Sequence, residues 1–353
     1  MDLFYPLIGL LLMAFGLLGV GVAEPTLLGG HLLRVGLALL AMALGALLPP
    51  RLLLRHALGL HLFTLLLLLL LVLAFGEGPG GVRRWFYLGP VAFQPSELAK
   101  LSLVFYLASF VGRKGHDSPI LGPAILVGGT VGLVLVEPDF ATALFLFTLG
   151  ALLFILAGVP WRRLIAIALA GLLVISPFSG VYLKRFAYVS ERFGGFLSYL
   201  KGEASPKETA YQVLQAQKAI LMAGPLGQGP GATLLHLPEA HNDMVFASLV
   251  YATGWLGGLV VLFLYFLLFL KGFHLSLRLQ GPESLVAMGL TLYLTLQAAI
   301  NIGVTLGFLP VTGVPLPLIS YGGSSLLVSG LALGILTRLS WEASRKGVAR
   351  WSS

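Results

Sequence analysis

The sequence predicts an all-α polytopic membrane protein with ten transmembrane helices. Of its 353 residues, 58% are apolar and only 10% are charged, whereas soluble domains have about 45–50% and about 25%. The mean hydropathy is +0.95. Since a membrane-spanning helix needs about 20 mostly apolar residues, this apolar fraction suffices for about ten of them. A soluble enzyme, a DNA-binding module and a secreted disulfide-bonded domain are excluded, and the absence of cysteine also excludes thiol nucleophiles and thiolate metal sites.

Apolar runs long enough to cross a bilayer define the predicted spans within a single integral membrane domain, residues 1–353. They cover residues 4–23, 31–49, 57–75, 97–112, 119–136, 139–157, 162–178, 243–270, 284–306 and 321–338. The first run is a span rather than a signal peptide, because no Lys or Arg precedes it. A long extracytoplasmic loop, residues 179–242, separates spans seven and eight, and a re-entrant-like loop rich in proline and glycine precedes span ten.

The net charge of +8 is interpreted as membrane topology. With the N-terminus in the cytoplasm, the inner loops and the C-terminal tail hold most of the basic residues: Arg51, Arg55, Arg113, Lys114, Arg162, Arg163, Lys271, Arg278, Arg338, Arg345, Lys346 and Arg350. The short outer loops hold Arg83 and Arg84, with Arg34 and Lys100 at span edges. This asymmetry predicts that both termini are cytoplasmic in a multi-pass protein of a cytoplasmic membrane. The expected surroundings are membrane lipids, and no nucleic-acid partner is expected.

The first polar cluster precedes span four on the predicted outer side. Arg84 stands in an aromatic stretch, and Ser96 is a plausible N-cap. Glu97 and Lys100 are three residues apart and share one helix face. Two interpretations stay open: a self-compensating pair at the end of a span, or the polar wall of a cavity with cations available for a phosphate.

Two further patterns are interpreted as structural. Glu137-Pro138-Asp139 between two spans is typical of helix capping. The pairs Gly254/Gly258, Gly303/Gly307 and Gly330/Gly334 have the spacing that lets helices approach closely.

The long outer segment predicts an amphipathic helix over residues 211–222, where Gln212, Gln215 and Lys218 are three apart. Beyond it, Glu239, His241 and Asp243 place three titratable side chains within five residues at the threshold of span eight. The alternatives are a helix cap with solvated neighbours, or a chemical site.

Residues 307–325 contain three prolines and several glycines, which exclude a continuous helix, yet the segment is too apolar for a solvated loop. Irregular backbone at membrane depth is tolerated where it is buried in protein or lines a cavity. Ser320, Tyr321 and Ser324 are the polar residues at its end. Its Gly-Gly-Ser stretch lacks a lysine partner and is not a phosphate loop by itself.

At these places the chain resembles the SEDS (shape, elongation, division and sporulation) family of bacterial membrane proteins. The matching stretches run in family order: Arg84-Trp85 with Leu88-Gly89, Phe93-Gln94-Pro95-Ser96-Glu97 with Lys100, Tyr211-Gln212 with Gln215, Leu237-Pro238-Glu239-Ala240-His241 with Asp243, and Pro315-Leu316-Pro317-Leu318-Ile319-Ser320-Tyr321-Gly322-Gly323-Ser324. The lead-in over residues 311–317 is more similar to the elongation branch than to the division branch. The chain departs from the common pattern at Asn242, where many relatives carry threonine.

The resemblance implies a ten-span fold and a peptidoglycan glycosyltransferase that polymerises lipid II on the outer face of the cytoplasmic membrane during cell elongation. It matches the family's catalytic acid to Asp243. It implies a class B penicillin-binding protein, a transpeptidase, as partner.

The transfer requires a carboxylate near the attacking sugar hydroxyl and cations near the pyrophosphate. Asp243 is the expected base, or the ligand of a divalent cation such as Mg²⁺ or Mn²⁺. Arg84 and Lys100 are candidates for the phosphate, with Lys218 further behind, and Glu97 would orient Lys100. The other expected substrate-binding residues are Gln215, Glu239, His241, Ser320, Tyr321 and Ser324. A lipid II flippase or a non-catalytic scaffold for cell-wall synthases are the alternatives.

Overall fold

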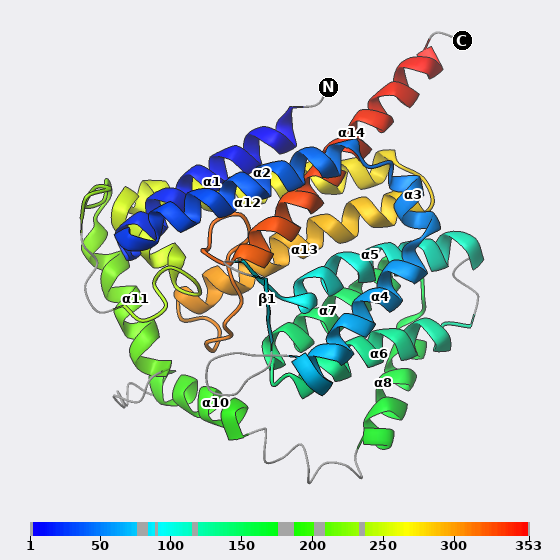
Figure 1. Ribbon diagram of the computed structural model, residues 1–353, viewed down its shortest axis with the longest axis horizontal. Helices are drawn as coiled ribbons and strands as arrows, with labels where there is room; N and C mark the ends of the chain where they lie inside the picture. The colour runs from blue at the N-terminus through cyan, green and yellow to red at the C-terminus, as the bar shows by residue number, and fades with distance from the viewer. Residues whose placement is uncertain are drawn as a thin grey trace. The chain divides into compact units, whose positions relative to one another are not determined.

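The computed structural model describes residues 3–75, 84–88, 91–114, 119–175, 187–200, 209–232 and 237–351, and most of these residues are helical (Figure 1). Arg83 lies outside the described residues, as do the side chains of Lys114, Lys346 and Arg350.

A helix coincides with each of the ten apolar runs. The helices are α1 (Phe4–Ala23), α2 (Leu28–Leu47), α3 (Pro50–Arg55), α4 (Ala57–Leu70), α5 (Pro95–Lys114), α6 (Leu121–Val136), α7 (Phe140–Leu156), α8 (Trp161–Ile175), α10 (Ala187–Leu200), α11 (Thr209–Ala223), α12 (Val245–Arg278), α13 (Pro282–Thr305) and α14 (Gly323–Trp351). A 3₁₀ turn (Pro25–Leu27) precedes α2, and a π-helical turn (Leu71–Phe75) continues α4.

Five of the described segments are long and apolar enough to cross a membrane: Phe4–Ala23, Pro25–Leu47, Val245–Arg278, Pro282–Thr305 and Gly323–Arg345. Three shorter apolar helices are Ala57–Leu73, Leu121–Val136 and Phe140–Leu156. The predicted all-α membrane fold is confirmed, and the count of ten spans stays a prediction.

Two features near α5 differ from expectation. A hairpin of β1 (Phe86–Leu88) and β2 (Val91–Phe93) precedes the helix, with Phe86 opposite Phe93. Strands of three residues are too short to show a period-two pattern, although aromatic residues favour them. The prediction that Ser96 caps α5 is wrong, because the helix begins at Pro95, and the buried Ser96 Oγ has no hydrogen-bond partner among the described residues.

The chain divides into two compact units. The first comprises Met1–Ala46, Tyr188–Lys271 and Leu294–Thr337, and the second comprises Leu47–Ala187, Gly272–Tyr293 and Arg338–Ser353. The polar residues at the start of α12 and in the loop before α14 belong to the first unit, whereas Arg84, Glu97 and Lys100 belong to the second.

In the first unit α14 packs backbone to backbone against α2. A Cβ added at Gly330 would lie 2.4 Å from the Ala38 carbonyl oxygen, and one at Gly334 would lie 2.0 Å from that of Met42. The predicted role of this glycine pair in close packing is confirmed. Gly254 acts differently, because its φ of 79° and ψ of 178° interrupt α12.

In the second unit α5 contacts α3, α4, α6 and α7. The buried His61 of α4 bridges two of these helices, with Nδ1 3.0 Å from Ser102 Oγ of α5 and Nε2 3.2 Å from Thr130 Oγ1 of α6. Because burying a polar ring without partners is costly, this pair of contacts stabilises one arrangement of the three helices.

Candidate functional site

Asp243 stands at the end of a tight turn that leads into α12. The backbone N–H groups of Asn242 and Met244 both donate to the Glu239 carbonyl oxygen, at 3.0 and 3.2 Å. The Asn242 side chain also donates to the Glu239 carboxylate at 3.1 Å. In this turn Glu239 is exposed, Asp243 is half-buried and Met244 is fully buried.

The loop before α14 is bonded to this turn along its length. Ser320 Oγ donates to the Asn242 carbonyl oxygen at 2.8 Å and accepts from the Leu316 N–H at 2.7 Å. The Tyr321 N–H donates to the His241 carbonyl oxygen at 3.0 Å. Two regions that lie about 80 residues apart in the chain, and that the sequence marked separately, therefore form one structure.

Asn301 of α13 ties the same two segments together. Its buried side-chain amide donates to the Asp243 carbonyl oxygen at 2.9 Å and to the Val314 carbonyl oxygen at 2.8 Å. Gln297, one helical turn earlier, donates to the Pro315 carbonyl oxygen at 2.9 Å. These amides satisfy the carbonyl groups of an irregular buried backbone, which would otherwise be left without partners.

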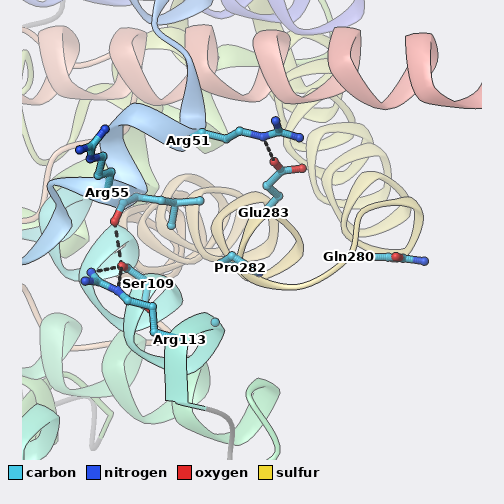
Figure 2. Close-up of a pocket in the computed structure, with 9 residues that line it drawn as sticks. Arg51, Arg55, Ser109, Arg113, Gln280, Pro282 and Glu283 are labelled. Atoms are coloured by element: carbon cyan, nitrogen blue, oxygen red, sulfur yellow. Dashed lines mark hydrogen bonds and ion pairs between the residues drawn. The ribbon is translucent and has the colours of Figure 1, made fainter.

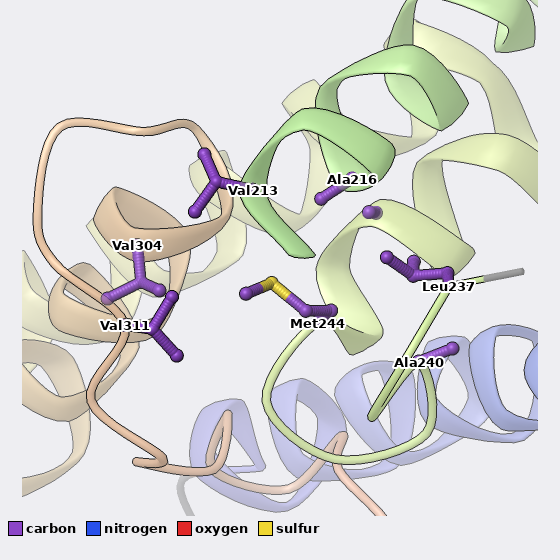
Figure 3. Packing of buried hydrophobic residues seen from close by; sticks show 8 residues of the cluster. Val213, Ala216, Leu237, Ala240, Met244, Val304 and Val311 are labelled. Carbon is purple, nitrogen blue, oxygen red and sulfur yellow. The ribbon is translucent and has the colours of Figure 1, made fainter. Parts of the chain in front are cut away.

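An apolar cluster that includes Ala240 and Met244 of this turn fixes the position of the turn (Figure 3). It joins α11, the turn, the end of α13 and the loop, and consists of Val213, Ala216, Leu237, Ala240, Met244, Ala247, Val304 and Val311. Met244 next to Asp243 is fully buried in it. The turn that carries Asp243 is therefore packed into apolar side chains rather than solvated.

Arg192 of α10 contacts the loop before α14, close to Asp243. Its Nη1 donates to the Val311 carbonyl oxygen at 2.8 Å. A Cβ added at the exposed Gly313 would lie 3.5 Å from Asp243 Oδ2 and 3.8 Å from Arg192 Nη1. Gly313, whose φ is 79°, therefore lies beside both the Asp243 carboxylate and the Arg192 guanidinium and brings no side chain into the space next to them.

A second arginine, Arg34 of α2, lies over the Tyr321 ring at 3.7 Å from its centre. Its buried Nη1 has no hydrogen-bond partner among the described residues. The His241 ring meets Tyr321 edge-on at 5.6 Å, and the His31 ring lies 5.9 Å from it. Tyr321 therefore connects the turn that carries Asp243 to a positive charge at the start of α14.

The remaining candidates of the first unit lie on α11 and α14. Gln215 is half-buried and Lys218 is exposed on α11, whereas Ser324 is buried in the first turn of α14. The side chain that joins α11 to the loop is Gln217, which lies within 2.6 Å of Tyr199 Oη and donates to the Leu306 carbonyl oxygen at 2.9 Å.

In the second unit Glu97 and Lys100 form a buried ion pair. Lys100 Nζ lies 2.6 Å from Glu97 Oε1, and the two side chains are 1% and 2% exposed. The ammonium also lies 5.3 Å from the centre of the Phe145 ring and 5.7 Å from that of Tyr293. The ion pair keeps the ammonium buried, and a role for Glu97 and Lys100 in binding substrate stays a prediction.

Arg84 is engaged at the turn between α6 and α7. Its Nε donates to the Glu137 carbonyl oxygen at 3.0 Å, and its Nη2 donates to that of Pro138. Asp139 caps α7 by accepting from the Thr142 N–H at 3.1 Å, as predicted. Burial raises the pKa of Glu137 to about 9, and the negative charge of Asp139 contributes to the increase. The positive charge of Arg84 acts in the opposite direction.

No group of three or more His, Asp or Glu side chains that could hold a metal ion occurs among the described residues. At the described site the chain offers a divalent cation one carboxylate ligand, Asp243. Such a cation, when bound, would supply Lewis-acid activation of a sugar hydroxyl.

Arg34, Arg192 and Asn301 are site residues that sequence analysis missed. Arg34 and Arg192 carry no local motif, and Asn301 occurs within an apolar helix. Asn301 could have been found from the cost of placing an amide inside a membrane span, which requires partners. The two arginines could not have been assigned, because their neighbours come from distant segments.

The fold and the site together define an integral-membrane protein that has a half-buried carboxylate at the start of an apolar helix and two arginines around the same loop. The chain belongs to the FtsW/RodA/SpoVE family of cell cycle proteins, whose family model matches residues 15–345. This is the SEDS family, so the predicted membership is confirmed.

Among curated relatives, a probable peptidoglycan glycosyltransferase FtsW of Tolumonas auensis is 34% identical over 95% of this chain and 92% of its own length. The peptidoglycan glycosyltransferase MrdB of Escherichia coli is 34% identical over 86% of this chain and 82% of its own length. The predicted enzyme class, a glycosyltransferase of peptidoglycan synthesis, is thereby confirmed. Relatives of both the division and the elongation branch match.

Two solved structures resemble the chain over nearly its whole length. One belongs to a study of how a peptidoglycan synthase complex coordinates polymerisation and crosslinking, with 32% identity, a TM-score of 0.78 and coverage of 97% of this chain and 98% of that one. The other is the rod shape determining protein RodA of Thermus thermophilus, with 29% identity, a TM-score of 0.71 and 97% of each chain covered.

Proposed function

We propose that this protein polymerises lipid II into glycan strands during cell elongation, with Asp243 as the catalytic residue on the outer face of the cytoplasmic membrane. The observation that carries the proposal is the convergence at Asp243 of three separate segments, joined by Asn301 and Ser320 and accompanied by Arg192. A scaffold protein would have no need to fix one half-buried carboxylate by contacts from three separate segments.

In the proposed reaction the Asp243 carboxylate accepts the proton of the 4-hydroxyl of one sugar. The hydroxyl oxygen attacks the anomeric carbon of the other sugar, and the bond from that carbon to the lipid pyrophosphate breaks. The electron pair of this bond leaves with the pyrophosphate. A single displacement inverts the linkage from α to β, so a second, nucleophilic carboxylate is not required.

Charge on the departing pyrophosphate needs cations in place before the reaction. Arg34 and Arg192 supply them within the first unit, and the N-terminus of α14, next to Arg34, adds a partial positive charge. Lys218, His241, Ser320, Tyr321 and Ser324 remain candidates for binding the sugars and phosphates, together with Gln215 and Glu239. We infer that Lys100, Glu97 and Arg84 stabilise the second unit rather than bind phosphate, because Lys100 and Glu97 form a buried pair and Arg84 donates two hydrogen bonds to the turn between α6 and α7.

The proposed partner is a class B penicillin-binding protein that cross-links the new strands. Both a crosslinking complex and a RodA are structural relatives over nearly the whole chain. The proposed topology has both termini in the cytoplasm, as the distribution of Lys and Arg predicts.

The test is an assay of purified protein with its transpeptidase partner and lipid II, in which the glycan products are sized. Asp243→Asn keeps the size and shape of the side chain but replaces one acceptor oxygen by an NH2 donor and removes the basicity. We expect it to lower the polymerisation rate by about a hundredfold or more. Glu24→Gln, which neutralises an exposed acid of the same unit, is the matched control and should polymerise like the parent.

Three outcomes separate the alternatives. Polymer from the parent and the control but not from a folded Asp243→Asn variant supports the proposal. Equal polymer from both would remove Asp243 from the mechanism. Transbilayer movement of lipid II without polymer would identify a flippase, and neither activity would identify a scaffold.

A further inference from the structure

The second unit contains a cavity of about 500 Å³ that the glycosyltransferase reaction does not use (Figure 2). The cavity lies between α3, the end of α5 and the connection from α12 to α13. Its polar lining consists of Arg51, Arg55, Ser109, Arg113, Gln280 and Glu283. Three guanidinium groups thus face one carboxylate, so the cavity has an excess of positive charge.

Two of the arginines are held in place by the protein. Arg113 Nε donates to Ser109 Oγ at 3.1 Å, and the same hydroxyl donates to the Leu54 carbonyl oxygen at 2.8 Å. Arg51 Nε lies 3.3 Å from Glu283 Oε1. Because the Arg51 side chain is 73% exposed, this ion pair leaves most of its guanidinium open.

Arg55 is different, because in the part of the chain that the structure describes its side chain has neither an ion pair, as Arg51 does, nor a hydrogen bond, as Arg113 does. It is exposed at the last residue of α3. Two arginines held in place by the protein, with a third that has no partner, are a suitable arrangement for the oxygens of a phosphate.

The floor of the cavity is fixed by a close approach of α5 to the start of α13. A Cβ added at Gly112 would lie 2.8 to 3.0 Å from the ring carbons of Pro282. The approach brings Arg113 and Glu283 to one cavity from segments about 170 residues apart, so the positive lining depends on the fold rather than on a single charged loop.

Exposed leucines on α3, which lines the cavity, and on the following helix α4 favour a lipid over a soluble anion. Leu52 lies on α3 between the two arginines and is 47% exposed. Leu58, Leu62, Leu66 and Leu69 follow on one face of α4 and are 40% to 49% exposed. A ligand with a phosphate and acyl chains would satisfy the arginines and this apolar face together.

We propose that this cavity binds the phosphate of an anionic phospholipid headgroup, with the acyl chains along α4. Basic pockets between membrane helices on the cytoplasmic side bind such headgroups. In the topology proposed above the lipid belongs to the inner leaflet, so the site is separate from the outer-face chemistry and its test does not depend on polymerisation.

The experiment measures lipid binding to the full protein in detergent by native mass spectrometry. The probes are phosphatidylglycerol, phosphatidylcholine as a zwitterionic lipid, and inorganic phosphate as the soluble anion. Arg55→Gln is the main variant, because Arg55 has no partner whose loss would unfold the protein, and Arg113→Gln is the second. Arg163→Gln removes an exposed arginine of α8 that does not line the cavity.

We expect the parent to prefer phosphatidylglycerol to phosphatidylcholine, and each cavity variant to bind phosphatidylglycerol about fivefold more weakly. Gln280→Arg, which adds a guanidinium to the lining, should strengthen binding by a similar factor, and Arg163→Gln should leave it unchanged. Equal binding by Arg55→Gln, Arg163→Gln and the parent would overturn the proposal. Inorganic phosphate that competes fully with the lipid would also overturn it, in favour of a soluble anion.

Discussion

Two buried carboxyl groups in the second unit, those of Glu97 and Glu137, differ in whether a cation neutralises them. The Glu97 carboxylate forms a buried ion pair with Lys100, with Oε1 2.6 Å from Nζ. The buried Glu137 carboxylate has no hydrogen-bond partner among the described residues, and the nearby Arg84 donates to backbone carbonyl groups instead. Burial and the charge of Asp139 therefore raise the pKa of Glu137 to about 9, so this side chain is neutral at pH 7.

The raised pKa makes the stability of the protein depend on pH. The folded-state pKa of about 9 lies above the ordinary value of 4.5, so between these values the folded protein binds the extra proton. The free energy of unfolding must then fall as pH rises through this window and level off above it. We expect Glu137→Gln, which resembles the protonated acid, to weaken this dependence and to raise the unfolding temperature at pH 8 by a few degrees.

Thermal unfolding of parent and variant in detergent from pH 5 to 9 is the measurement. Glu24→Gln provides the control, because it removes an exposed acid and should retain the dependence of the parent. Curves for Glu137→Gln and the parent that run parallel across the whole range would contradict a buried, neutral Glu137.

The sequence predicted only those site residues that lie in a recognisable local motif. Glu239, His241 and Asp243 lie close together in the chain, and Ser320 and Tyr321 end a motif of unusual composition. Arg192 reaches Asp243 only because α10 folds back to the loop at Val311. The positions of Arg192 and Asp243 in the sequence give no sign of this contact, so no sequence motif could have predicted it.

Among the elements, helices were predictable because a bilayer requires each apolar run to satisfy its own backbone. The predicted run of residues 4–23 coincides with α1, and that of residues 139–157 differs from α7 by one residue at each end. The hairpin of β1 and β2 was missed because its strands are three residues long. The interruption of α12 at Gly254 was also missed, since glycine within an apolar run has the same appearance whether it packs or bends.

The contact between α2 and α14 depends on the absence of a side chain at Gly334. Gly334→Ala would place a Cβ 2.0 Å from the Met42 carbonyl oxygen, and neither backbone can move without separating the helices. We expect a loss of about 1–3 kcal/mol of stability or more. Gly36→Ala is the matched control on α2, because its Cβ would meet nothing within 4 Å.

Thermal unfolding and size-exclusion chromatography of the two variants give the measurement. Alanine favours helix over glycine by about 1 kcal/mol, so Gly36→Ala should be neutral or slightly stabilising while Gly334→Ala unfolds at a lower temperature. Equal unfolding temperatures would mean that α2 and α14 do not pack as closely as this structure has them.

For the molecule as a whole, orientation in the membrane is the property on which the proposed outer-face chemistry depends. Twelve Lys and Arg side chains occur in the predicted inner loops and tail, and few occur in the short outer loops. Such an excess of positive charge is retained on the cytoplasmic side during insertion. The long segment before α12 is too long to be governed by this rule, so its side follows from the spans around it.

Because the chain contains no cysteine, single-cysteine variants can report this orientation against a parent that does not react. Gln228→Cys, Gln280→Cys and Ser344→Cys each replace an exposed residue, in the predicted outer segment, an inner connection and the inner tail respectively. A membrane-impermeant maleimide applied to intact cells should label Gln228→Cys alone, and the other two only after permeabilisation. Labelling of Gln280→Cys from outside, with Gln228→Cys protected, would invert the topology and place Asp243 on the cytoplasmic side, where it could not build an external wall.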